Sequence, residues 1–60
     1  MNQKTFVARI RALGKDVFGV RDVRLLFPKE ARFVNTNLKR FKDAGVVTPV
    51  TRGLYRLSET

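Results

Sequence analysis

Residues 31–45 read ARFVNTNLKRFKDAG, and the organisation of this stretch decides the fold of the whole chain. Val34, Leu38 and Phe41 recur at i, i+4 and i+7, with Asn37 at the margin, which is the spacing of one face of an α-helix. Gly45 then supplies a helix stop. We therefore predict a helix over residues 31–44 whose outward face is basic and rich in amide and hydroxyl groups: Arg32, Asn35, Thr36, Lys39, Arg40 and Asp43.

Two shorter helices are predicted on the N-terminal side of this stretch. Asn2 can cap a helix over residues 2–13, and Gly14 can end it. A second helix over residues 20–27 closes at Pro28, before a short break over residues 28–30. Residues 16–19 are too short for a helix and rich in β-formers, which predicts a brief strand or an extended link. The apolar stripes of the two helices are Phe6, Val7, Ile10 and Leu13, and Val20, Val23, Leu26 and Phe27.

On the C-terminal side, residues 46–50 and 54–57 are typical of two short β-strands. The turn between them, residues 51–53, contains Gly53, which can adopt a positive φ at low cost. Pro49 cannot donate to a strand ladder, so we expect it at a sheet edge or a bulge. The ring of Tyr55 is expected to pack under this hairpin with its hydroxyl at the surface. Residues 57–60 are expected to be frayed.

The order of these elements is helix, short strand, helix, tight break, helix and hairpin. It predicts one domain over residues 1–60, of the α+β class but mainly α, with Phe18 and Phe41 in the core. Among such domains it favours a winged helix-turn-helix, in which three helices are followed by a β-hairpin wing. A short strand is expected between the first two helices.

The charge of the chain points to a polyanionic partner. Thirteen Lys and Arg against five Asp and Glu leave a net charge of +8, which favours nucleic acid or an anionic membrane surface as the neighbour. The chain has no Cys and no His, which removes disulfides, thiolate nucleophiles, imidazole bases and the usual zinc ligands. We therefore expect no enzyme, no cofactor and no metal site. No apolar run approaches the roughly 20 residues that a membrane span needs, so we also expect a cytoplasmic protein associated with the nucleoid.

Four segments of the sequence resemble the N-terminal winged-helix domain of AbiEi-type antitoxins and related small bacterial regulators. They are VFGVRDV at residues 17–23, NLKRF at 37–41, AGVV at 44–47 and RGLYRL at 52–57. The resemblance implies DNA binding and transcriptional regulation, as a repressor or autoregulator of an operon. Gly19 departs from the Thr or Ser cap common in such domains, which predicts a less well tied helix start. A second departure is that no C-terminal antitoxin domain follows within these 60 residues.

Double-stranded DNA is the expected partner, with the third helix in the major groove. Asn pairs with adenine and Arg with guanine, so base contacts are expected from Arg32, Asn35 and Thr36. Phosphate contacts are expected from Arg21, Lys29, Lys39 and Arg40. At the hairpin tip, Arg52 is expected to meet the minor groove or the flanking backbone. One such domain covers few base pairs, which favours a homodimer or copies side by side on DNA.

Other functions stay open at this point. A winged helix can also serve as a protein-interaction module within a larger nucleoprotein assembly, and Leu25, Phe33 and Leu54 could form its apolar patch. RNA binding is less favoured because the hairpin offers only one aromatic residue, Tyr55. Membrane association through the basic first helix ranks last, because the core needs the same apolar stripe. No small-molecule ligand is predicted.

The role of Phe33 is also open. The helical count places it toward the outward face, where a large exposed aromatic needs a reason. Its ring could fold back onto the second helix, contact a second copy of the chain, or pack near DNA sugars. We expect the first of these.

Overall fold

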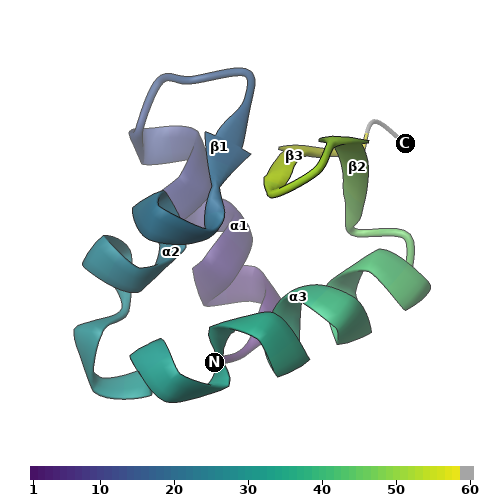
Figure 1. Cartoon of the computed structure of the whole chain (residues 1–60). Helices are drawn as coiled ribbons and strands as arrows, with labels where there is room; N and C mark the ends of the chain where they lie inside the picture. The colour runs from purple at the N-terminus through teal and green to yellow at the C-terminus, as the bar shows by residue number, and fades with distance from the viewer. Residues whose placement is uncertain (59–60) are drawn as a thin grey trace.

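Four helical segments and three strands follow one another along residues 1–58, the part of the chain that the computed structural model describes (Figure 1). The fold is therefore α+β and mainly helical, as predicted. In chain order the elements are α1 (Gln3–Ala12), β1 (Phe18–Gly19), α2 (Val20–Leu26), the 3₁₀ helix η1 (Pro28–Phe33), α3 (Val34–Asp43), β2 (Val47–Thr51) and β3 (Leu54–Leu57).

The first helix begins and ends at the residues that the sequence indicates. The backbone N–H of Thr5 donates to the side-chain oxygen of Asn2 at 2.8 Å, so Asn2 is the N-cap of α1. After the helix, Gly14 adopts a φ of 71°, and its N–H donates to the carbonyl of Arg11. This left-handed conformation favours glycine and lets the chain turn away toward β1.

The start of the second helix is stabilised by a hydrogen bond that was not predicted. Gly19 has no side chain to cap it, but the Asp22 carboxylate accepts the backbone N–H of Gly19 at 2.9 Å. Lys15 donates to the other carboxylate oxygen at 3.3 Å. The expectation of a poorly capped helix start at Gly19 was therefore wrong, because the capping bond comes from Asp22, a residue inside the helix.

The predicted third helix begins three residues late. Residues 31–33 belong to η1, and the α-helix starts at Val34. Pro28 lacks a backbone N–H, and Glu30 departs from helical geometry with φ −115° and ψ 15°. The Glu30 N–H instead donates to the carbonyl of Phe27 at 3.0 Å. The chain therefore crosses from α2 to α3 in tight 3₁₀ turns.

The three strands form an antiparallel sheet in the order β1-β3-β2. Pro49 lies on β2, at an edge of the sheet, and the register shifts between Pro49 and Thr51, so Val50 is the extra residue of a bulge. Both positions predicted for Pro49 thus apply, since an edge strand and a bulge tolerate a missing donor. The turn contains Gly53 at a φ of 79°, as predicted.

Fraying was wrongly expected at residues 57 and 58. Leu57 pairs with Val47. The Ser58 N–H donates to the carbonyl of Val46 at 2.8 Å, and the Ser58 hydroxyl lies 2.6 Å from that of Thr48. These bonds satisfy polar groups that a frayed end would leave to water. The expected fraying of residues 59–60 lies outside the described residues.

One apolar core holds the helices and the sheet together. Phe6 lies at its centre, with ring centroids 4.5 Å from Phe41, 6.0 Å from Phe18 and 6.2 Å from Phe27. Tyr55 is half-buried and its ring packs against Phe18 at 6.3 Å. The buried core consists of Phe6, Ile10, Phe18, Val23, Phe27, Val34, Leu38, Phe41 and Val47.

Candidate nucleic-acid interface

The outward side of α3 carries four of the predicted contact residues. The inner side is committed to packing, since Val34, Leu38 and Phe41 are buried in the core. The exposed side presents two uncharged polar groups followed, one turn later, by two cations. These residues are Asn35, Thr36, Lys39 and Arg40.

Asn37 is not a marginal surface residue but a buried polar one. Its side chain is 9% exposed, and its amide donates to the carbonyl of Phe33 at 2.9 Å. Phe33 is the N-cap of α3, so this bond spans the junction of η1 and α3. A buried amide is stable only when it is hydrogen-bonded, and Asn37 therefore holds the first turn of the helix in place.

The predicted contacts Lys29 and Arg32 lie on η1, immediately before α3. Arg32 was expected in the first half of the recognition helix, and this placement was wrong because the 3₁₀ segment extends to residue 33. Both side chains are exposed. The guanidinium of Arg32 lies 5.9 Å from the centre of the Phe33 ring. A cation and an exposed aromatic ring are therefore adjacent at the N-terminus of α3.

The hairpin turn brings Arg52 to the side of α2. Gly19, which precedes α2, pairs with Leu54, and a Cβ at Gly19 would lie 3.4 Å from the carbonyl oxygen of Gly53. The turn that carries Arg52 therefore lies against the start of the helix that carries Arg21. Both of these side chains are exposed.

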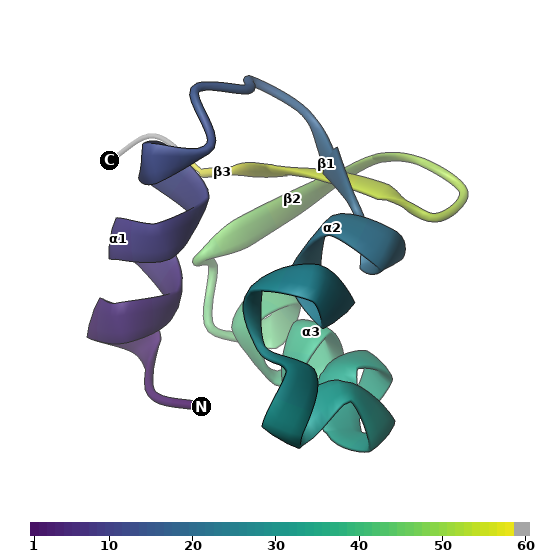
Figure 2. The same cartoon turned by 90° about the vertical axis from the view of Figure 1, so that its left-hand side faces the viewer.

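Eight predicted contact side chains are exposed: four on α3, two on η1, one on α2 and one in the hairpin turn. We call them together the α3 face. The elements that carry them lie on one side of the fold: in Figure 2 the hairpin turn reaches out on the same side as α2 and α3, while α1 lies on the opposite side. Ion pairs within residues 1–58 involve other groups, namely the Met1 ammonium with Glu30 and Lys15 with Asp22. The α3 face consists of Arg21, Lys29, Arg32, Asn35, Thr36, Lys39, Arg40 and Arg52.

Two cations outside the α3 face, Arg9 and Lys15, are held by contacts within the fold. Arg9 donates to the carbonyl of Leu26 at 2.9 Å, and its guanidinium lies 4.9 Å from the centre of the Phe27 ring. Lys15 is held by Asp22, whose pKa is lowered below its ordinary value first by the Gly19 N–H and then by Lys15. These two side chains are therefore less available to a partner than the six cations of the α3 face. Five further exposed cations lie outside that face without an ionic partner among residues 1–58: Lys4, Arg11, Arg24, Lys42 and Arg56.

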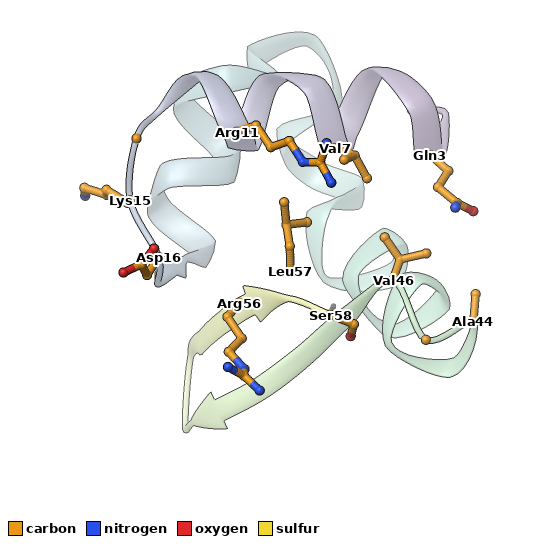
Figure 3. A pocket seen from close by; sticks show the side chains of 12 residues that line it. Gln3, Val7, Arg11, Lys15, Asp16, Ala44, Val46, Arg56, Leu57 and Ser58 are labelled. Atoms are coloured by element: carbon orange, nitrogen blue, oxygen red, sulfur yellow. The ribbon is translucent and has the colours of Figure 1, made fainter. Parts of the chain in front are cut away.

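A cleft of about 1030 Å³ lies between α1 and the sheet (Figure 3). Val7 and Arg11 reach into it from α1, and Leu57 reaches toward them from β3. Charged groups of both signs line it, including Arg11 and Asp16, and it is open to solvent. This differs from the enclosed, largely apolar pocket that small-molecule sites show. Within residues 1–58, no cluster of acidic side chains could hold a metal ion.

Several large apolar side chains are exposed. Phe33 is 55% exposed, so its ring is not buried against α2 as expected, because the 3₁₀ segment that carries it contributes no buried residue. Leu25 is 74% exposed and Leu54 is also exposed, as the interaction-module alternative requires. Val17 and Val50 are exposed as well, which the sequence pattern did not indicate.

No helix within residues 1–58 is long and apolar enough to cross a membrane. Comparison with protein-family profiles, with curated protein sequences and with solved structures found no match to the chain.

Proposed function

We propose that the chain is a winged helix-turn-helix domain that binds double-stranded DNA sequence-specifically, as a small transcriptional regulator. The observation that carries this proposal is the α3 face, where six exposed cations without an ionic partner among residues 1–58 accompany Asn35 and Thr36. The net charge of +8 destabilises the compact state through self-repulsion, which a bound polyanion would relieve.

The order of the strands supports the winged-helix assignment. A two-residue strand before α2 pairs with the second strand of the C-terminal hairpin, so the sheet order is β1-β3-β2. This arrangement places the hairpin turn beside the start of α2, on the side of α2 and α3 (Figure 2). A wing that contacts DNA next to a recognition helix requires such a placement.

The geometry suggests a division of roles on the duplex. Asn35 and Thr36, in the first turn of α3, would reach base edges in the major groove, with Arg32 beside them on η1. Lys39 and Arg40, one turn later, would bind phosphates. The other cations of the face, Arg21, Lys29 and Arg52, would hold the flanking backbone, and Arg52 could enter the minor groove.

Duplex titration at several salt concentrations tests the proposal. With about five to seven phosphate contacts, log K should fall with log salt at a slope of roughly −4 to −6. The double variant Asn35→Ala/Arg40→Ala should lose binding while its circular dichroism stays unchanged. Its matched control is Gln3→Ala/Arg11→Ala, which also removes one exposed amide and one exposed arginine but from α1, on the opposite side.

Equal losses in the two double variants would mean that net charge, rather than the α3 face, drives binding. No duplex binding by the wild type even at low salt would refute the proposal. The exposed Leu25 and Phe33 would then favour the second candidate, a protein-interaction module.

One domain of this size should need a second copy for high specificity. We therefore propose that the protein binds DNA as a homodimer or as copies side by side on repeated half-sites. Sedimentation of the protein with its best duplex tests this, and a single copy per duplex would contradict it.

A further inference from the structure

We propose that Phe33 determines part of the sequence specificity by contacting the 5-methyl group of a thymine in the major groove. This inference rests on the proposed DNA-binding function and assigns to that site a preference that charge alone cannot supply.

The exposure of Phe33 is the first observation. The chain has five Phe, and the other four, Phe6, Phe18, Phe27 and Phe41, are all buried in the core. Phe33 is 55% exposed. The core is complete without its ring, so packing gives no reason for an aromatic residue at this position.

The position of Phe33 is the second observation. As the N-cap of α3, it precedes Thr36 by three residues and Arg40 by seven, the spacing of one row along a helix. Thr36 and Arg40 are both exposed members of the α3 face. A helix that turns this row toward DNA therefore brings the Phe33 ring with it.

The backbone that carries the ring is also held in place. Asn37, which is buried, donates its side-chain amide to the Phe33 carbonyl at 2.9 Å. A fixed backbone lowers the entropy lost when the ring contacts a base. Asn37 is thus a positioning residue for Phe33.

The surroundings of the ring favour DNA over an apolar protein partner. The Arg32 guanidinium lies 5.9 Å from the ring centre, and the same helical row carries Arg40. A ring among cations fits a polyanion that also offers an apolar group. The thymine methyl is the apolar group on the major-groove edge of DNA, and Arg pairs with guanine there. The expected preference is for a thymine next to a guanine.

The test begins with the duplexes that wild type selects from a randomised library. Each thymine of the best site is then replaced by deoxyuridine, which removes the methyl group and keeps the hydrogen-bonding edge. Loss of one buried methyl corresponds to about a fourfold weaker affinity. We expect that loss at one thymine beside a guanine, and we expect Phe33→Ala to bind the two duplexes equally.

Three further variants separate this contact from other effects. Phe33→Leu should retain part of the thymine preference, because it keeps an apolar side chain. Leu25→Ala truncates an exposed apolar residue of α2 and should leave the preference unchanged. Asn35→Ala should bind more weakly but still discriminate thymine from uracil, because binding free energies of independent contacts add.

The outcomes distinguish the two proposals. If wild type binds duplexes through the α3 face but tolerates uracil at every position, the Phe33 inference is overturned and the proposed function stands. A thymine preference that persists in Phe33→Ala overturns it equally. If wild type binds no duplex, both proposals fall together.

Discussion

Replacing Phe6 by Ala should remove a large part of the protein's free energy of unfolding at 25 °C. Phe6 is fully buried at the centre of the core, against the rings of Phe18, Phe27 and Phe41. Truncation of a buried Phe to Ala costs about 3–5 kcal/mol, from lost transfer energy and from the cavity left behind. A chain of 60 residues has a free energy of unfolding of about 3–9 kcal/mol, at about 0.05–0.15 kcal/mol per residue.

A milder substitution at the same site should give a measurable shift. Phe6→Leu keeps much of the volume, so a cost of about 1–2 kcal/mol is expected from imperfect repacking and lost ring contacts. For a domain of this size, that corresponds to a midpoint of thermal unfolding lower by roughly 5–15 °C. The matched control for Phe6→Ala is Phe33→Ala, which makes the same chemical change at a residue that is 55% exposed.

Thermal and urea unfolding followed by circular dichroism would measure these effects. Phe33→Ala should stay within about 0.5 kcal/mol of wild type, as surface substitutions usually do. If Phe6→Ala melts cooperatively within a few degrees of wild type, or if the two Phe→Ala variants lose similar stability, the description of Phe6 as the centre of the core is refuted.

Three other predictions concern charge, protonation and the hairpin turn. Lys39→Gln/Arg40→Gln should make the slope of log K against log salt in duplex binding shallower by about 2. The control Lys4→Gln/Arg11→Gln on α1 should change this slope less. Equal changes in the two titrations would contradict the assignment of DNA binding to the α3 face. The pKa of Asp22 is lowered from 3.8 by the Gly19 N–H and Lys15. The stability that the Asp22 carboxylate contributes is therefore present at neutral pH and is lost as the pH falls below about 4 through the folded pKa. In urea unfolding, the free energies of unfolding of wild type and Asp22→Asn should converge in that pH range. A difference that stays constant with pH would argue against the bond between Asp22 and Gly19. Gly53 has a φ of 79°, so Gly53→Ala should cost about 1–2 kcal/mol. Gly19→Ala, at a φ of −109° with ordinary contacts, should be nearly neutral in thermal unfolding, and the reverse order would refute this reading of the turn.

Much of the fold could be predicted because its signals are local. The stripe of Val34, Leu38 and Phe41 predicts a helix and its buried side from spacing alone, and Asn2 and Gly14 mark the ends of α1 through their own backbone and side-chain chemistry. Asn35, Thr36, Lys39 and Arg40 are exposed for the same reason, since a helical residue opposite a buried stripe must face solvent.

The starts of α2 and α3 were harder to predict because competing local bonds decide them. Pro28 and Glu30 leave the chain between two helical geometries, and the tight 3₁₀ turns that join α2 to α3 place Arg32 before α3. At Gly19, a missing side-chain cap suggested a loose end, whereas the Asp22 carboxylate three residues later supplies the bond.

The sequence by itself determined the helical periods, the glycine turns, the hairpin and the excess of positive charge, because each depends on residues close together in the chain. Only the tertiary structure decided which cations remain free and which polar groups are buried. Arg9 is committed to a carbonyl at Leu26, seventeen residues away, and the charge of an arginine gives no sign of such a partner. The pairing of β1 with β3 likewise joins residues far apart in the chain, and that contact brings the hairpin turn beside α2. Long-range contacts of this kind depend on how the core closes, which no local pattern of residues specifies.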